Sequence, residues 1–597
     1  MPLLDWFIVV ALNGSIMAFG LVLARGTRSS AEWFLAGRRL PWWIVGLSMY
    51  ATAIDASDLV ADSGGTYTLG FSYFVSNMVG LVAGWGLAAF FVFLPMYRAG
   101  MYTNAEYLEA RFGPATRVLC ALVQVQYRTL VLAIMGGSLY WTLNVVCGFG
   151  HFPALLSVVL VAVFASIYTA LGGLRSVAIT DVLQFGVMTI AALVVWFVVV
   201  DRLGGWSGVE ERLADAEFSY LLDAGRDHVA IEDVSANTPQ EIDRKLLLGG
   251  EHDGAESVIR RTTPGWLVAL GLIIMGLGYP IVNHTQSMRM FASKSEWDLK
   301  MSVTVAGLVL IVMSFFNLSM GVLGRAWVPD QAVLPGGNQD QIYPWLVRQI
   351  ETIGLKGIVV AGIFAAAFST YDSIGSSLSA LLTRDVYARF LVRTREDHHY
   401  LRVGQWLTPV VIGISFAYLP FLLEGGMLLR FLDLTSTFVV PLLTVFLMGT
   451  FTRVHRASGT LGLLVGAAYG VLRLFAPTIA ESWGIAVLPG VLVDFYCAYA
   501  FSMLITASAM VIVSLVKGWE PRGVTMAARD HQQEGWHQQE GWHEQEGWLR
   551  SSQEEVLTLQ SAESADAAPR EKSAVLPAVL AVLVVALGCY LCFFLWW

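Results

Sequence analysis

Long apolar blocks, separated by short polar loops, dominate the sequence. Each block holds about 20 residues, which matches the hydrocarbon thickness of a bilayer. The apolar residues form continuous blocks rather than amphipathic stripes, as expected for helices surrounded by lipid. The pattern predicts an all-α polytopic membrane protein of about fourteen transmembrane helices. The predicted spans are 4–24, 41–69, 71–97, 117–146, 152–172, 174–200, 265–285, 297–328, 356–390, 401–423, 427–451, 457–476, 488–516 and 573–597.

The short loops differ in charge between the two predicted sides of the membrane. Basic residues gather in alternate loops, whereas 147–151 and 477–487 contain no Lys or Arg. Because positively charged loops stay on the cytoplasmic side, both termini are predicted to lie outside the cell. The basic residues on the predicted cytoplasmic side are Arg25, Arg28, Arg38, Arg39, Arg98, Arg111, Arg175, Arg289, Lys294, Lys300, Arg384, Arg389, Arg393, Arg395, Arg402, Arg453 and Arg456.

Composition supports the membrane assignment and excludes other classes. Apolar and aromatic residues make up 56% of the chain and charged residues 14%, whereas soluble domains carry about 25% charged residues. The net charge is −9 and no basic patch is present, so nucleic-acid binding is not expected. The N-terminus lacks a basic region, so 4–24 is predicted to be a retained helix rather than a signal peptide. No H-E-x-x-H motif occurs and no enzymatic activity is expected.

The predicted domain organisation is a transmembrane core with polar additions. Residues 1–516 form the core, 201–264 an extracellular loop, 517–572 a cytoplasmic low-complexity linker, and 573–597 a terminal helix. The linker contains a tandem hexapeptide, HQQEGW-HQQEGW-HEQEGW, whose period fits neither helix nor strand.

Two spans differ from the others in composition. The second contains Asp55, Asp58 and Asp62 among small residues, and the seventh is interrupted by Gly276, Gly278 and Pro280. Small residues alone would ease helix packing, but carboxylates at membrane depth are costly. Irregular backbone at that depth is tolerated where it lines a cavity, and paired broken spans mark transporter binding sites. Each broken span is the first of five, which predicts inverted repeats at approximately 41–200 and 265–451.

The ninth span carries a polar face. Ser369, Asp372, Ser373 and Ser376 lie at i, i+3, i+4 and i+7, so they share one side of a helix. Hydroxyl and carboxylate oxygens suit hard cations, although serines in membrane helices also bond back to their own backbone. Asp181 in the sixth span has no basic residue near it in sequence and is predicted to join this cluster.

Five motifs in order resemble the sodium:solute symporter family, which includes the sodium/glucose cotransporters and has a fold similar to that of LeuT. The resemblance covers about residues 30–516 and implies a 5+5 inverted repeat with extra terminal helices. The motifs are AEWFLAGRRLPWW (31–43), NAEYLEARFG (104–113), YTALGGLRSVAITDVLQ (168–184), FSTYDSIGSSLSALLTRDVY (368–387) and VPLLTVFLMGTF (440–451).

The resemblance implies two sodium sites and an inner gate. Tyr279 occupies the place of the inner-gate tyrosine and is expected to cap the solute. The first sodium site would use the carbonyls of Ala51, Ile54 and Ala366 with the hydroxyls of Ser369 and Thr370. The second, found in some members, would use Asp181, Ser369, Asp372 and Ser373.

The expected solute site departs from the sugar carriers. Ala53 and Asp58 replace their asparagine and histidine, and Asp433, followed by Ser436, replaces a glutamine. Together with Asp55 and Tyr279, these residues are the candidate solute ligands. The extra carboxylates favour a cationic solute or hydrogen-bond a polyol, and if protonated they would add proton coupling.

The sequence therefore predicts a multi-pass protein of the cell membrane that imports a small polar solute together with sodium. The alternatives are a cationic amine or proton-coupled solute in place of a sugar or polyol, and a transporter-like membrane sensor. A sensor would need a larger output domain than the polar residues after 516 provide.

Overall fold

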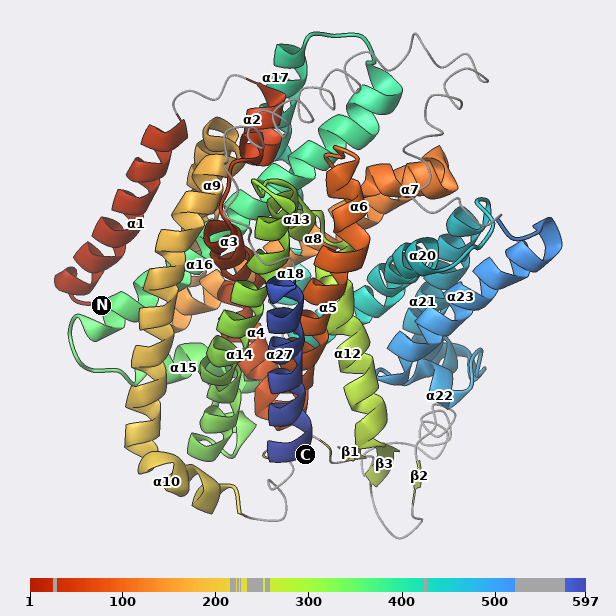
Figure 1. Ribbon diagram of the computed structural model, residues 1–597. Coiled ribbons are helices and arrows are strands. Elements are labelled where there is room, and N and C mark those ends of the chain that lie inside the picture. The colour runs from red at the N-terminus through yellow and green to blue at the C-terminus, as the bar shows by residue number, and fades with distance from the viewer. Residues whose placement is uncertain are drawn as a thin grey trace.

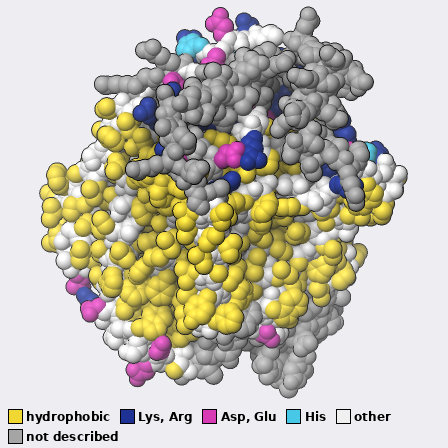
Figure 2. All heavy atoms as spheres, viewed as in Figure 1, with side chains coloured by type: hydrophobic (Ala, Val, Ile, Leu, Met, Phe, Trp, Pro, Cys, Tyr) yellow, Lys and Arg dark blue, Asp and Glu magenta, His cyan; other side chains and the backbone are white. Residues whose placement is uncertain are grey.

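The protein is a helical bundle, seen here in a computed structural model (Figure 1). The structure describes residues 1–24, 29–214, 222, 225, 227–233, 251–252, 258–423, 427–520 and 575–596. The hexapeptide repeat and most of the predicted linker 517–572 lie outside these residues, as does much of the loop 201–264. Figure 2 shows apolar side chains covering the middle of one face, with charged side chains mostly toward its two ends. This distribution fits a bundle that crosses a bilayer.

The described helices follow the predicted spans closely. In the list of bounds, η marks a 3-10 or π segment. The elements are α1 Leu3–Ala24, α2 Ser30–Leu35, η1 Ala36–Arg38, α3 Trp42–Ala53, α4 Ala56–Leu69, η2 Gly70–Tyr73, η3 Ser76–Leu81, α5 Val82–Leu87, η4 Ala88–Val92, α6 Phe93–Arg98, α7 Asn104–Phe112, α8 Pro114–Trp141, η5 Thr142–Val146, α9 His151–Leu203, α10 Gly205–Arg212, α12 Gly265–Val282, α13 His284–Phe291, α14 Glu296–Trp327, η7 Gln331–Val333, η8 Pro335–Gly337, η9 Gln339–Gln341, α15 Ile342–Arg348, α16 Leu355–Leu381, η10 Leu382–Leu391, α17 Asp397–Ser415, α18 Leu419–Leu422, α19 Met427–Leu434, η11 Thr435–Val439, α20 Val440–Phe451, α21 Ser458–Trp483, α22 Gly490–Val493, α23 Cys497–Lys517, α27 Leu576–Tyr590 and η13 Leu591–Leu595.

Within the described residues, 11 helices are long and apolar enough to cross a membrane, or 12 when the bent pair α3–α4 is counted as one span. The prediction was about fourteen. Part of the difference lies in α9, which covers the two predicted spans 152–172 and 174–200. Its backbone leaves the helical conformation at Gly173 (φ 62°, ψ 178°). A Cβ at this glycine would lie 3.0 Å from the Trp33 Cα, so the chain turns where only glycine fits.

The break in the second span is built by a capping box. α3 ends at Ala53, and α4 starts at Ala56 after a bend of 53°. The Asp55 carboxylate accepts a hydrogen bond from the Ser57 amide (2.6 Å), and the Asp58 carboxylate accepts one from the Asp55 amide (2.6 Å). These reciprocal bonds satisfy the amides that open a new helix. Two of the three carboxylates in this span therefore stabilise the break itself.

The break in the seventh span falls later than predicted. α12 stays helical through Gly276, Gly278 and Pro280, and the chain leaves the helix at Asn283, whose side chain caps α13. A Cβ at Gly276 would lie 2.2 Å from the Ser76 carbonyl oxygen of η3. This glycine therefore allows two backbones to approach closely and does not interrupt the helix.

α16 lies at the centre of the bundle and packs against α9, α1, α8 and α17. In its most apolar window, within 355–391, 89% of residues are buried, against 17% in the terminal helix α27 and η13. The polar face predicted on the ninth span is therefore enclosed on all sides. Because this face is buried, its hydroxyls and carboxylate need hydrogen-bond partners within the protein.

The loop 201–264 contains a small antiparallel sheet in addition to α10. β1 His228–Asp233, β2 Glu251–His252 and β3 Val258–Thr263 pair in the order β1-β3-β2. The all-α prediction therefore holds for the spans but misses these strands. Figure 1 places the C-terminal end of α27 at the same end of the molecule as α10 and β1.

Candidate functional site

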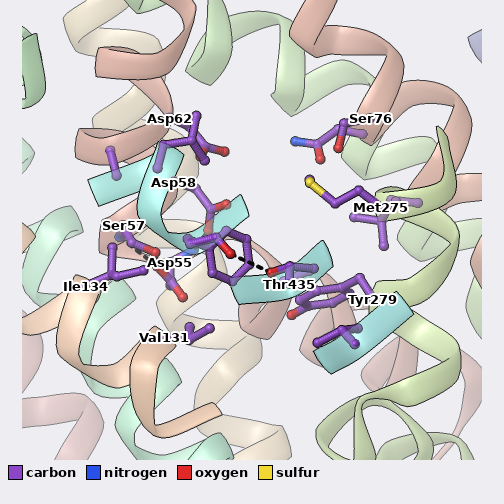
Figure 3. Close-up of a pocket in the computed structure, with 18 of the residues that line it drawn as sticks. Asp55, Ser57, Asp58, Asp62, Ser76, Val131, Ile134, Met275, Tyr279 and Thr435 are labelled. Atoms are coloured by element: carbon purple, nitrogen blue, oxygen red, sulfur yellow. Dashed lines mark hydrogen bonds between the residues drawn. The ribbon is translucent and has the colours of Figure 1, made fainter. Parts of the chain in front are cut away.

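A cavity of about 760 Å³ lies between the two broken spans. Figure 3 shows Asp55, Asp58 and Asp62 on one side and Tyr279 with Met275 on the other. The lining comes mainly from α4, η3, α8, α12 and η11. The described residues that line the cavity are Ala53, Asp55, Ser57, Asp58, Ala61, Asp62, Tyr73, Ser76, Asn77, Leu81, Tyr127, Arg128, Val131, Ile134, Met275, Gly276, Tyr279, Leu428, Phe431, Thr435 and Val439.

The acidic side of the cavity is one face of α4. Asp55, Asp58 and Asp62 follow one another at helical spacing, and all three line the cavity. Asp55 and Asp58 also hold the capping box, whereas Asp62 accepts a hydrogen bond from the Tyr73 hydroxyl (3.3 Å). The sequence singled out Asp62 as a costly carboxylate but did not predict it as a solute ligand.

Arg128 faces this acidic side and was missed by the sequence reasoning. It lies on α8, with its guanidinium 5.5 Å from the Tyr127 ring centroid and 5.6 Å from that of Tyr279. Its Nε and Nη2 are buried and have no hydrogen-bond partner in the described part of the chain. An arginine in the interior of a predicted span was the available signal, since such a residue is costly at membrane depth.

Of the predicted solute ligands, Ala53, Asp55, Asp58 and Tyr279 line the cavity. The Tyr279 hydroxyl donates to the Thr52 carbonyl (3.2 Å), which joins the two broken spans. The tyrosine predicted as the inner gate therefore stands against the break in the second span.

Asp433 and Ser436 do not reach the cavity. The Asp433 carboxylate accepts a hydrogen bond from Arg473 Nη2 (2.6 Å), and the Ser436 hydroxyl lies 3.2 Å from the same nitrogen. The turn of α19 into η11 presents Thr435 to the cavity instead. Arg473 is 40 residues from Asp433, so the sequence pattern gave no sign of this pairing.

The predicted first sodium site lies where α3 ends beside α16. The Asp55 amide, which would continue the helix to the Ala51 carbonyl, binds Asp58 instead. That carbonyl is left to the Ser369 hydroxyl, at 3.0 Å. Thr370 Oγ1 is buried with no hydrogen-bond partner among the described residues. The unused hydroxyl follows in sequence the serine that bonds the Ala51 carbonyl, and oxygen atoms of these kinds suit a cation. Ile54 is in extended conformation at the break, and Ala366 lies one turn before Thr370 on α16.

The predicted second site already holds a positive charge. Arg289 Nη2 lies 2.9 Å from Asp181 Oδ2, and both side chains are fully buried. The expectation that no basic residue neutralises Asp181 is therefore wrong, because the arginine comes from α13, 108 residues later. Ser373 also accepts a hydrogen bond from Arg289 Nη2.

The remaining members of the polar face have partners within the bundle. Asp372 Oδ1 accepts a hydrogen bond from the Thr169 hydroxyl of α9 (2.7 Å). Ser369 Oγ lies 2.8 Å from Asp181 Oδ1, and the Ser376 hydroxyl bonds back to the Ser373 carbonyl (3.2 Å). The structure thus brings Asp181, Ser369 and Ser373 together and turns Asp372 toward α9.

Two broken spans that frame a polar cavity, with a cation-suited oxygen cluster beside the first break, define a cation-coupled secondary transporter. The model of the Sodium:solute symporter family matches residues 33–466. The chain belongs to this family. It is a sodium-coupled symporter of a small solute, it lies in the membrane, and sodium is the co-transported ion.

Similar proteins include the sodium/glucose cotransporter of Vibrio parahaemolyticus, 26% identical over 77% of this chain and 83% of that protein. Human sodium/glucose cotransporter 4 is 28% identical over 84% of this chain and 75% of that protein. Sodium/myo-inositol cotransporter 2 of Rattus norvegicus is 26% identical over 84% of this chain and 75% of that protein. These relatives are transporters.

The predicted LeuT-type fold is confirmed by a solved structure. A Na⁺-coupled sialic acid symporter in a substrate-bound outward-open state matches with a TM-score of 0.68, over 86% of this chain and 98% of that one. Its sequence identity is 18%, so the likeness concerns the fold alone.

Proposed function

We propose that the solute imported with sodium is a small polar molecule that carries a positively charged nitrogen. The observation that carries this proposal is the charge of the cavity. Asp55, Asp58 and Asp62 line it, and Arg128 is the one basic side chain among its described lining residues. A cationic group seated between Asp58 and Asp62 would offset the excess negative charge in a site of low dielectric constant.

The three carboxylates differ in how far they are free to bind a solute. Asp55 is committed to the Ser57 amide and Asp58 binds one amide, whereas Asp62 contacts the Tyr73 hydroxyl. A solute ammonium would therefore meet Asp62 and the remaining lone pairs of Asp58. A proton could neutralise the same pair, which is the route by which transport would become proton-coupled.

A sugar or polyol is the second candidate, and one observation favours it. Tyr127 and Phe431 stack in the cavity lining with ring centroids 5.8 Å apart, which provides a flat apolar surface beside hydrogen-bonding carboxylates. The named relatives are glucose and myo-inositol cotransporters. Arg128 could donate its unused N–H groups to solute hydroxyls.

We propose that the first sodium site couples ion and solute. Sodium held by Ala51, Ile54, Ala366, Ser369 and Thr370 would join the α3 break to α16. The same break starts α4, which carries the solute carboxylates. Sodium would thereby stabilise the conformation in which the solute site is complete, and each ligand would raise the affinity for the other.

A thermal-shift screen of the purified protein tests the solute class. Sugars, polyols, amino acids and quaternary amines are compared in sodium and in choline buffer. We expect stabilisation by a cationic solute in sodium only. Stabilisation by a neutral sugar, with no response to amines, would overturn the cationic class and support the second candidate.

Matched carboxamide variants test the acidic side of the cavity. D62N is expected to weaken binding of a cationic solute by about tenfold, which corresponds to about 1.4 kcal/mol. D201N, at the exposed end of α9, serves as the control and should bind like the wild type. Equal affinity in D62N and wild type would remove Asp62 from the site.

We also propose that both termini face outward, with 201–264 on the same side. The distribution of basic loops supports this orientation, and so does the common end shared by the C-terminus, α10 and β1 in Figure 1. An epitope tag at the N-terminus should be labelled by antibody in intact cells. Labelling only after permeabilisation would contradict the proposed orientation and place the N-terminus inside the cell.

A further inference from the structure

Arg289 is a buried arginine whose three side-chain nitrogens all bind neighbouring helices or its own helix. Its Nη2 bonds Asp181 (2.9 Å), its Nε bonds the Ser48 hydroxyl (2.7 Å), and its Nη1 bonds the Thr285 carbonyl (2.9 Å). Ser373 accepts a further bond from Nη2. The side chain is fully buried.

The guanidinium occupies the surroundings that a second sodium ion would need. Asp181 and Ser373 both bind Arg289 Nη2, and Ser369 Oγ bonds the other oxygen of Asp181. A sodium ion bound to the same oxygens would stand against a fixed positive charge in a medium of low dielectric constant, where repulsion is strong. The charge of Asp181, one of the two carboxylates of this position, is already compensated by Arg289.

The two cation positions can be told apart by their ligands. At the first, Thr370 Oγ1 has no hydrogen-bond partner in the described structure. The Ala51 carbonyl, which the capping box releases from the helix, accepts the Ser369 hydroxyl.

At the second position, Asp181 and Ser373 are already bonded to Arg289. Asp372 Oδ1 is bonded to Thr169 of α9, and its Oδ2 has no hydrogen-bond partner among the described residues. The two positions thus differ in that a fixed positive charge is bound at the second.

We propose that Arg289 acts as a tethered cation at the second position, so that the transporter binds and moves one sodium ion per cycle, at the first site. Arg289 sits on α13 and its partners lie on α9, α3 and α16. A covalently attached charge supplies the same bonds between these helices as an ion would, but it does not dissociate to either side. The inference rests on sodium symport and is independent of the solute class.

The test is the stoichiometry of ²²Na⁺ binding to the purified full chain, measured by scintillation proximity without solute. We expect one ion per wild-type protein and a Hill coefficient near one. T370A, which changes the first site only, should lose sodium affinity by about tenfold or more. Binding of two ions per wild-type protein would overturn the role of Arg289. Binding of no ion would overturn the first site itself.

Variants of the pair give the positive test. R289Q leaves Asp181 unpaired and should raise the stoichiometry from one to two. The double variant R289Q/D181N removes both charges and should return it to one. It also keeps the test open if the single variant does not fold, because it removes the Asp181 charge together with the arginine that pairs with it. Folded R289Q that still binds one ion, or a double variant that binds two, would contradict the proposal.

Discussion

At the scale of single residues, the site depends on which polar atoms are left without a partner. The Asp58 carboxylate takes the amide of Asp55, and the Ala51 carbonyl is thereby released toward Ser369. Thr370 contributes a buried hydroxyl with no partner in the described chain. The capping interaction thus takes the Ala51 carbonyl out of the helix, where it is available to the proposed ion site.

Replacing the Thr370 hydroxyl tests this arrangement. T370A should raise the sodium concentration needed for half-maximal uptake by about tenfold, because one oxygen ligand is lost, a change of about 1.4 kcal/mol. T370S keeps the hydroxyl and should stay within about threefold of wild type. The measurement is the sodium dependence of solute uptake in proteoliposomes, and an unaltered dependence in T370A would remove Thr370 from the site.

At the scale of helices, close backbone contact fixes the position of the seventh span. Gly276 of α12 stands against the Ser76 carbonyl of η3, where a Cβ would lie at 2.2 Å. Gly80 faces Ile273 of α12 in the same way, at 2.8 Å. These two glycines allow α12 and η3 to pack backbone to backbone beside the cavity.

Substitution at this contact should separate the two helices. G276A is expected to destabilise the protein by about 1–3 kcal/mol because the extra methyl group has no space. G86A is the matched control, since a Cβ at Gly86 meets nothing within 4 Å. Thermal unfolding of the two variants is compared by fluorescence-detected size exclusion. Equal unfolding midpoints would show that the helices move apart to accept the methyl group without loss of stability.

A group of ion pairs joins α7, which lies outside the spans, to α8 and η10. Arg117 bonds Glu109 and Asp385, and Arg389 lies 2.7 Å from Glu109. Burial by itself would raise the pKa of Glu109, but Arg117 and Arg389 together hold that pKa below its ordinary value of 4.5. The ionised carboxylate therefore ties the three elements together.

The pH dependence of stability follows from this lowered pKa. A carboxyl with a lower pKa in the folded state contributes stability above its ordinary pKa, and that contribution is lost as the pH falls through the lowered value. We expect the unfolding midpoint to fall below about pH 4.5. In E109Q the midpoint should be lower at neutral pH and should fall less on acidification. An E109Q curve parallel to wild type would assign the acid sensitivity to other groups.

At the scale of the whole molecule, sodium symport requires that ion binding and solute binding shift the same conformational equilibrium. The two broken spans meet at the cavity, where Tyr279 of α12 bonds the Thr52 carbonyl at the end of α3. The proposed first sodium site lies at the same end of α3. A single rearrangement around these breaks can therefore open or close both sites.

Ion replacement tests the coupling directly. Uptake of the solute found in the thermal-shift screen should stop when sodium is replaced by choline or potassium. Restored sodium should lower the solute concentration needed for half-maximal uptake. Uptake of equal rate in all three salts would contradict coupling to sodium.

The sequence alone determined the membrane class, the approximate spans, the broken second span and the polar face on the ninth. These features depend on local runs and on helical spacing, which residues close in sequence define. The family followed from motifs in order along the chain. The position of the second break could not be read in the same way, because Gly276 and Pro280 fit within a continuous α12 once η3 packs against it.

Only the tertiary structure decided which charges meet. Asp181 pairs with an arginine 108 residues away, and Asp433 pairs with Arg473 outside the cavity, whereas Arg128 enters it. The sequence shows that a carboxylate is buried and needs a partner, but it does not show whether that partner is an ion, a proton or a distant guanidinium. Which of these it meets depends on the packing of helices remote in sequence, and that packing pairs Asp181 with Arg289 while it leaves the Thr370 hydroxyl of the proposed ion site without a partner among the described residues.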